Sequence, residues 1–339
     1  MVTKSLISNF IEKFETSNSL PCIKNKLYPI TAPVTTGDGA TKFRIAVISD
    51  DDENSKKGDK NWMSIFRKGW LTYKPGEVRV EFDDPSQDTE LNYGFNNKLR
   101  GMELSDLVTF NGRLMTCDDK TGEVYELIND NKEVLSFAHL NNGDSRDNDA
   151  FKCEWLAVKD GKLHVGSHGR EWIGDDGQSD ESMKWIKIVD TCGVITNVNW
   201  IDKYNALRDE TNNKFPGYLI HESAVWSDLH KKWFFMPRKV SKVSYNDKED
   251  EKRCGNWITM ADENFENIEN MDIGEKEPTY GFSAFRFIPE TKDEVFVAVK
   301  TEEVDGKVAS KLVAYDIGGN KKMDPVPLGN LKFEGIEFI

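Results

Sequence analysis

Long apolar runs are absent from this sequence. No stretch of its 339 residues approaches the roughly 18 consecutive apolar residues that a membrane-spanning helix needs. Its first residues lack the basic segment and the apolar segment of a signal peptide, and the Gly-rich Walker A pattern of P-loop enzymes does not occur. We therefore expect no membrane span in this chain and no P-loop chemistry.

Cysteine is scarce, and basic residues are fewer than acidic ones. The five cysteines are far apart and form no CxxC pair, which argues against a zinc site. Two disulfides with one free thiol and no disulfide at all both remain open. The 45 basic and 59 acidic residues give a net charge of −14. Because this charge repels nucleic acid and anionic membranes, we expect no nucleic-acid partner, and a polyanionic substrate would need a local cation or basic patch.

Two kinds of pattern divide the chain. Apolar residues at helical spacing in 6–14 predict a short amphipathic helix on the outside of the fold, and prolines at 21, 29 and 33 make the following segment a linker. From Phe43 onward, short β runs alternate with turn residues, and residues 69–73 and 78–82 are expected to form a hairpin through Pro75-Gly76. No helix of comparable strength is expected in this region. We therefore expect an N-terminal helix and linker over 1–42, packed on a β domain over 43–339.

Five segments of the β region share one local pattern, a Ser or Glu followed by a short β run. They lie 49 to 68 residues apart and begin at Ser105, Glu154, Glu222, Ser283 and Glu334. Repeats of roughly 40–50 residues are typical of four-stranded propeller blades, with the additional length in loops. The fifth segment has no room for a second strand, so strands around Ile45 and Leu71 are expected to complete its blade. The prediction is an all-β, five-bladed propeller whose N- and C-terminal strands close one blade.

The same five residues predict a metal site. The inner strands of a propeller start at one end of the central channel, so Ser105, Glu154, Glu222, Ser283 and Glu334 would form a ring there. Three carboxylates so close together repel one another or require a cation. Oxygen donors without Cys or His suit Ca²⁺ better than zinc or copper. The alternative is that each polar residue only caps its strand at the channel mouth. Because all five segments place such a residue at the same position, we favour the metal site.

Several longer motifs carry a resemblance to a known family. Residues 101–107 (GMELSDL), 154–158 (EWLAV), 217–223 (GYLIHES) and 334–339 (EGIEFI) strongly resemble the calcium-activated nucleotidases. The resemblance runs from about Phe43 to Ile339. It implies a five-bladed catalytic propeller with Ca²⁺ in its channel, which hydrolyses ADP, ATP, UDP or GDP to the monophosphate and inorganic phosphate. In that family the calcium ring falls on positions that match the five residues above.

The resemblance also implies residues for the chemical step. It assigns Asp50 and Asp119 to the catalytic mouth and Arg238 to a position that matters for activity. Phosphoryl transfer to water needs a cation on the phosphate oxygens, a basic clamp and an acid that orients the water. Without the resemblance, the acidic runs at 50–53 and 118–119 would be interpreted as solvated turns, and Arg238 as part of a surface ion pair.

Further neighbours are expected to bind the substrate. These are Asp52 and Asp118, which lie beside the two catalytic aspartates, and Lys239, which follows Arg238. Trp172 falls in a blade loop, where an indole either stacks on a nucleobase or packs on the propeller face. Lys184 stands where vertebrate members carry an acidic residue, which leaves the base preference open.

Two other functions compete with the nucleotidase. Many propellers are non-catalytic binding modules, but such a scaffold does not need three carboxylates at its channel mouth. A lactonase- or esterase-like calcium propeller would use Asn and Asp ligands and a His base, which the five segment starts lack. From the resemblance we expect a secreted protein whose leader has been removed, or one of the endoplasmic reticulum or Golgi lumen. It would be a monomer or a calcium-dependent homodimer.

Overall fold

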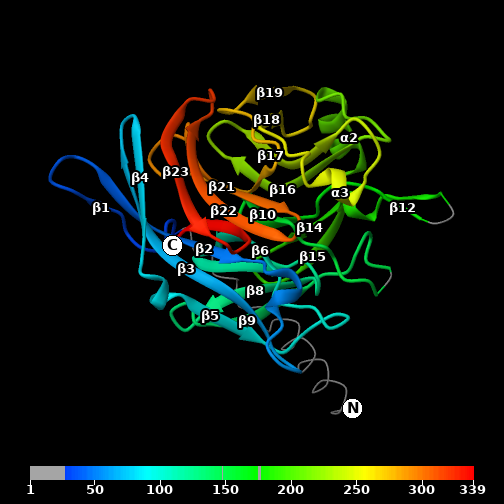
Figure 1. Cartoon of the computed structure of the whole chain (residues 1–339), viewed down its shortest axis with the longest axis horizontal. Helices are drawn as coiled ribbons and strands as arrows, with labels where there is room; N and C mark the ends of the chain where they lie inside the picture. Colours follow the sequence, from blue (N-terminus) through cyan, green and yellow to red (C-terminus); the bar gives the residue numbers. More distant parts are fainter. Residues whose placement is uncertain (1–26, 147, 175–176) are drawn as a thin grey trace, which may run out of the picture.

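The computed structural model describes residues 27–146, 148–174 and 177–339, and within them five sheets of four or more strands form the blades of a propeller, beside one two-stranded sheet (Figure 1). The helix expected at 6–14 lies outside the described residues. No helix in the described part of the chain is long and apolar enough to cross a membrane. The propeller predicted from the repeat is therefore confirmed.

Four blades are antiparallel sheets of four strands that follow one another along the chain. In each, the strand nearest the channel comes first, as the repeat predicted. The strands are β6 (Leu104–Phe110), β7 (Arg113–Asp118), β8 (Glu123–Ile128) and β9 (Glu133–His139); β10 (Trp155–Lys159), β11 (Lys162–Gly166), β14 (Trp185–Val189) and β15 (Ile195–Asn199); β16 (Tyr218–Ser227), β17 (Lys232–Ser241), β18 (Trp257–Asp262) and β19 (Ile268–Asp272); and β20 (Tyr280–Phe287), β21 (Val295–Val304), β22 (Lys307–Asp316) and β23 (Lys321–Gly329).

The remaining blade joins the two ends of the β region. Its inner strand is β24 (Phe333–Phe338), which pairs antiparallel with β2 (Thr41–Ser49); then come β3 (Trp62–Lys74) and β4 (Glu77–Phe82). Short strands β1 (Val34–Thr35) and β5 (Thr89–Tyr93) add to β2 and β3. Ile45 lies opposite Phe338, and Val47 opposite Ile336. The closure predicted from the sequence is confirmed, as is the β3–β4 hairpin.

Apolar side chains fill each seam between neighbouring blades. The alternation of strand residues turns one face of every sheet toward the next blade, and five separate buried clusters result. They are represented by Phe43 with Val297, Phe66 with Leu107, Phe110 with Leu163, Trp155 with Trp233, and Phe234 with Phe296. The core is thus a ring of five seams around the channel.

One helix lies within the mainly β domain, in a region where the sequence pattern predicted no strong helix. Helix α2 (Ile201–Glu210) follows β15, and the Asn199 carboxamide accepts a hydrogen bond from the Ile201 backbone N–H (2.8 Å) at its start. Tyr204 and Leu207 are buried in the Trp155 seam. The helix has few apolar positions, so its stability depends on these tertiary contacts and not on a strong sequence pattern.

The other helical turns among the described residues are short. Three are 3₁₀ turns, η1 (Asp52–Ser55), η2 (Pro85–Gln87) and η3 (Ser182–Lys184), and one is the single turn α3 (Asp247–Asp250). A two-stranded hairpin, β12 (Trp172–Ile173) with β13 (Ser179–Asp180), projects from the blade that contains β10, β11, β14 and β15 (Figure 1). Both α3 and β12 lie in connections at the end of the channel where the predicted ring residues are found.

Candidate active site

β-Bulges position the ring side chains. In β16 the register shifts on either side of His221, and Glu222 has no partner; in β20 the unpartnered residue is Ser283. β24 has the same irregularity around Glu334. A bulge leaves one residue outside the ladder and redirects its side chain. The ring residues of β16 and β20 therefore lie inside longer strands, not at the strand starts that the sequence predicted.

The structure brings the five predicted ring residues together. Ser105 Oγ donates to Glu334 Oε2 (3.3 Å) from the opposite side of a blade seam. Glu154 immediately precedes β10, which packs against β16, the strand that carries Glu222. Four of the five are at most 5% exposed, and Glu222 is half-buried. The geometry is therefore one compact, oxygen-rich cluster contributed by all five blades.

Arg238 lies inside this cluster. Its Nη1 donates to Ser283 Oγ (2.5 Å) and pairs with Glu222 Oε2 (2.7 Å) and, more distantly, Glu334 Oε1 (3.4 Å). A Cβ on Gly281 would meet the Arg238 side chain at 2.6 Å, so a glycine two residues before Ser283 makes room for it. The predicted clamp thus binds the ring carboxylates directly.

Two lysines that the sequence analysis missed border the ring. Lys152 Nζ pairs with Glu154 Oε1 (2.7 Å) and also with Asp119. Lys332 Nζ pairs with Glu334 Oε1 (3.2 Å) and Asp50 Oδ2 (3.1 Å). Each lysine stands two residues before a ring glutamate, on the same face of an extended chain. This Lys-x-Glu spacing occurs five times in the sequence, so it points to these two lysines only where the glutamate is already a predicted ring residue.

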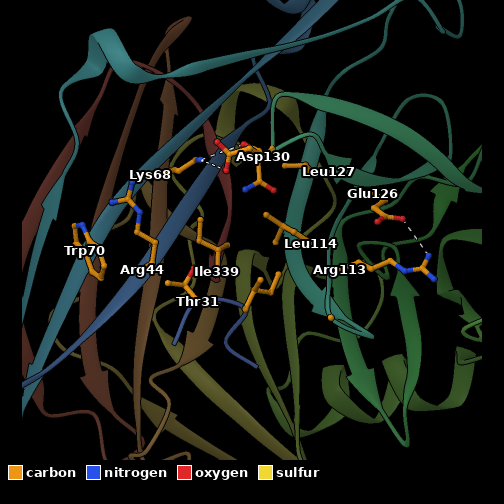
Figure 2. A pocket seen from close by; sticks show the side chains of 13 residues that line it. Thr31, Arg44, Lys68, Trp70, Arg113, Leu114, Glu126, Leu127, Asp130 and Ile339 are labelled. Carbon is orange, nitrogen blue, oxygen red and sulfur yellow. Dashed lines mark hydrogen bonds and ion pairs between the residues drawn. The ribbon is translucent and has the colours of Figure 1, made fainter. Parts of the chain in front are cut away.

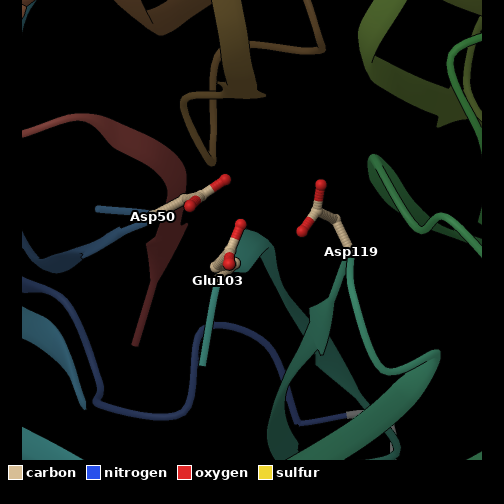
Figure 3. A group of neighbouring side chains, drawn as sticks. All are labelled: Asp50, Glu103 and Asp119. Atoms are coloured by element: carbon tan, nitrogen blue, oxygen red, sulfur yellow. The ribbon is translucent and has the colours of Figure 1, made fainter. Parts of the chain in front are cut away.

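A second acidic group lies beside the ring. Asp50 follows β2, Glu103 precedes β6, and Asp119 follows β7; Figure 3 shows their carboxylates converging. Their oxygens lie within 4.8 Å of one another. Arg100 fixes Glu103 through two hydrogen bonds, of 2.5 and 2.7 Å. Glu103 was also missed, although it stands two residues before Ser105, as the two lysines stand before their glutamates.

The electrostatics differ sharply within this group. Burial raises the pKa of Glu103 to about 8, in spite of Arg100. Burial would also raise that of Asp119, but Lys152 and Lys120 hold its pKa well below the usual value. Burial raises the pKa of Glu154 to about 7, against the effect of Lys152. Asp119 is therefore the carboxylate that stays ionised at neutral pH with cations beside it.

The predicted substrate-binding residues are more scattered. Asp52 lies near the mouth, where it pairs with Lys332 (3.1 Å). Asp118 is fully buried and accepts hydrogen bonds from three backbone N–H groups, which favours a role in holding the turn. Lys239 donates to the Asp250 carbonyl (2.9 Å). Trp172 is 43% exposed on β12, outside the ring.

Lys184 does not face the mouth. It is buried, and its Nζ pairs with Glu181 (2.8 Å) and Glu171 (3.5 Å) beneath the β12 hairpin. The Glu171 carboxylate also pairs with Arg208 (2.6 Å). Lys184 therefore anchors the segment that leads to Trp172, through Glu171, and it forms no ion pair with a ring residue.

A disulfide joins two arms of the mouth. Cys117 and Cys153 are bonded, and they lie next to the segments that carry Asp119 and Glu154. Cys192 is disulfide-bonded as well, whereas Cys254 is free and buried. The question that cysteine spacing left open is thus resolved in favour of disulfides.

Two cavities lie away from the ring. One, of about 480 Å³, is lined by Trp70, Leu114 and Ile339, and its charged groups pair with each other, as Arg113 does with Glu126 at 3.3 Å (Figure 2). The other, of about 580 Å³, lies at the opposite ends of the inner strands, near Phe110 and Phe287. No ring residue lines either cavity. The candidate site is therefore identified by its cluster of charged and polar side chains and not by one of these two cavities.

Known proteins share this sequence over most of its length. Residues 50–339 match the apyrase family. The chain is 41% identical over 317 residues to soluble calcium-activated nucleotidase 1 of Rattus norvegicus, covering 93% of this chain and 78% of that protein. It is 37% identical to an apyrase of Cimex lectularius (93% and 87% covered) and 32% identical to one of Phlebotomus duboscqi (91% and 93% covered).

Fold and site together define a five-bladed propeller with an acidic, lysine-bordered channel mouth. The match over 50–339 and the identity to these relatives show more: the chain belongs to the apyrase family. The resemblance noted from the motifs is confirmed.

Proposed function

We propose that this chain is a calcium-dependent nucleotidase that hydrolyses nucleoside di- and triphosphates (ADP, ATP, UDP and GDP) to the monophosphate and inorganic phosphate. Its relatives are named apyrases and calcium-activated nucleotidases. The observation that carries the proposal is the ring of three carboxylates and two hydroxyls, with Lys152 and Lys332 beside it. Neither competing function accounts for both parts.

The donor set of the ring fits Ca²⁺. It consists of oxygens only, and hard divalent cations prefer such ligands. We infer that Ser105, Glu154, Glu222, Ser283 and Glu334 hold the ion. When bound, Ca²⁺ supplies positive charge that offsets the charge on the phosphate oxygens. Arg238, which contacts Ser283 and Glu222, is assigned to positioning these ligands.

The mouth residues supply the remaining chemistry. Lys152 and Lys332 face the ring and provide the local basic patch that a polyanion needs in a chain of charge −14. Asp119 stays ionised and can accept a hydrogen bond from the attacking water. The water oxygen bonds to the terminal phosphorus and the water gives up one proton to solvent. The bond from that phosphorus to the bridging oxygen breaks, and the shortened nucleotide leaves with that oxygen. Asp50, Asp52 and Lys239 stay as predictions for the same mouth.

The compartment follows from the cysteines. Disulfides persist in oxidising environments, and this chain has the Cys117–Cys153 bond and a bonded Cys192. We propose a secreted protein or a resident of the secretory lumen.

Phosphate release tests the proposed function. The full chain is assayed with GDP, UDP, ADP and ATP in Ca²⁺, in Mg²⁺ and in chelator. We expect release in Ca²⁺, little in Mg²⁺, which yields its waters reluctantly, and none in chelator. A protein that releases no phosphate from any nucleotide in Ca²⁺ would contradict the proposal, and hydrolysis of lactone or ester substrates instead would favour the competing calcium propeller.

A further inference from the structure

The larger cavity is the opening of the channel at the end opposite the ring. Its volume is about 580 Å³. The inner strand of every blade lines it, through Phe110 in β6, Val158 in β10, Trp226 in β16, Phe287 in β20 and Glu337 in β24. Because these walls are mainly apolar and aromatic, an occupant with an apolar face would fit them. We call this cavity the far opening.

Polar groups on its wall show that the start of the described chain lies here. Leu27 and Tyr28 both line the far opening, and Tyr28 Oη donates to Glu337 Oε1 (3.1 Å). Thr109 lines it too, and the Thr109 Oγ1 atom is buried with no hydrogen-bond partner among the described residues. A buried hydroxyl without a partner costs free energy, so it calls for a neighbour that the described residues do not supply.

The cysteines give an independent connection to the same place. Cys192 is disulfide-bonded, and it lies in the β14–β15 turn beside Thr191, which lines the far opening. The Cys117–Cys153 pair is closed on itself, and Cys254 is free. Of the five cysteines, Cys22 alone is left as the partner of Cys192 within one chain. It belongs to residues 1–26, which precede the described part of the chain.

Residues 1–26 have the chemistry that suits the far opening. They carry four lysines and two glutamates, a net charge of +2 in a chain of −14. The charged residues among those described as lining the far opening are four acids and one arginine: Asp160, Asp228, Asp293, Glu337 and Arg286. Residues 6–14 place apolar side chains at helical spacing, which gives an apolar face for the aromatic walls. Charge and apolar character are therefore both complementary.

We propose that residues 1–26 cover the far opening and are held there by a Cys22–Cys192 disulfide and by Tyr28. An extended chain spans at most about 3.5 Å per residue, so the segment from Cys22 to Tyr28 is long enough to connect two walls of one cavity. The link joins the blade that contains β2 to the blade that contains β14, past the β6 blade between them. The channel is then open to solvent at the ring end alone.

Peptide mapping tests the covalent link. The full chain is alkylated in denaturant without reduction, digested and analysed by mass spectrometry, and a second sample is run on a non-reducing gel. We expect a Cys22 peptide joined to a Cys192 peptide, alkylation of Cys254 only, and migration as a monomer. An alkylated Cys22, a Cys192 joined to any other cysteine, or a disulfide-linked dimer would overturn the link.

Hydrogen exchange tests the covering itself. Phe10→Asn removes an apolar side chain from the face at 6–14, and the matched control Ser8→Asn puts the same residue on its polar side. In Phe10→Asn, backbone amides of 109–113 and 158–162, at the far opening, should exchange about 10-fold faster, since losing one buried phenylalanine weakens docking by at least that factor. The control should exchange as the wild type does.

Amides of β21, away from the far opening, report whether the fold is intact. If Phe10→Asn loses protection there as well, Leu6→Asn on the same apolar face takes its place. Equal exchange in the apolar-face variant and the control would mean that residues 1–26 do not cover the far opening. Protection that rises with protein concentration and ignores Phe10→Asn would likewise overturn the proposal and point to a second copy of the chain as the occupant.

Discussion

Opposite charges alternate at the channel mouth, residue by residue. Lys152 lies between Asp119 and Glu154, and Lys332 between Asp50 and Glu334. Each acid therefore has its charge set by the lysine beside it as well as by burial. Asp119, with Lys152 and Lys120, is the clearest case of a carboxylate kept ionised.

Asp119→Asn should separate catalysis from metal binding. The substitution removes the negative charge of the group that orients water but keeps the size of the side chain, so we expect kcat to fall about 10²- to 10⁴-fold. Because Asp119 is not one of the five ring residues, Ca²⁺ affinity should change little. Steady-state kinetics and calorimetric Ca²⁺ titration check this.

The matched variant is Glu154→Gln, which changes the ring carboxylate that shares the Lys152 ion pair with Asp119. It should lose Ca²⁺ affinity and rate together. If Asp119→Asn hydrolyses ADP at the wild-type rate in saturating Ca²⁺, its assignment is wrong and Asp50 becomes the next candidate.

At the residue scale, the sequence predicted which residues of the candidate site lie on or beside the inner strands, but not the contacts among them. Repetition along the chain was enough to find Ser105, Glu154, Glu222, Ser283 and Glu334, because equivalent positions recur in every blade. It could not reveal that Arg238 lies among them, since Arg238 comes from the second strand of its blade. Contacts between strands of different blades depend on the closed fold and leave no local pattern.

At the scale of elements, strands and hairpins followed from the sequence, whereas bulges did not. Alternating β runs and turn residues predicted the β3–β4 hairpin and all five inner strands. A bulge is decided by the pairing of two strands, so nothing within β16 or β20 alone marks Glu222 or Ser283 as unpartnered. Helix α2 was missed for a similar reason, since packing in the Trp155 seam stabilises it.

Gly335 tests how closely the inner strands approach. A Cβ there would lie 2.7 Å from the Asp106 carbonyl carbon and from Ile48 Cγ2. Gly335→Ala should therefore destabilise the fold by about 1–3 kcal/mol, as overpacking does. The control is Gly37→Ala, where nothing lies within 4 Å and the free energy of unfolding should hardly change. Denaturant unfolding measures both; equal values for the two variants would mean that β24 and β6 do not meet as closely as described.

At the scale of the whole molecule, the ring connects all five blades. Each blade contributes one donor, so an ion bound there stabilises every seam at once. Binding to the native state alone adds RT ln(1 + [Ca²⁺]/Kd), about 2.7 kcal/mol at 100-fold excess over Kd.

Chelation should consequently lower the melting temperature of the wild type by about 4 °C, given the entropy of unfolding of a chain this long. The Glu154→Gln, Glu222→Gln double variant, melted with and without chelator, should shift much less. A wild-type melting curve that is identical in Ca²⁺ and in chelator would contradict a ring that holds the ion.

The order of the strands has a consequence for how the protein is made. β24, which closes the blade that contains β2, β3 and β4, carries Glu334. Glu334 is therefore the last of the five ring residues to emerge during synthesis. Until it arrives, four blades and β2 exist without closure, and the ring has four of its five donors. If the ring holds Ca²⁺ as proposed, a chain that stops before residue 334 should retain the ion less well, and it would be an open propeller with exposed strand edges.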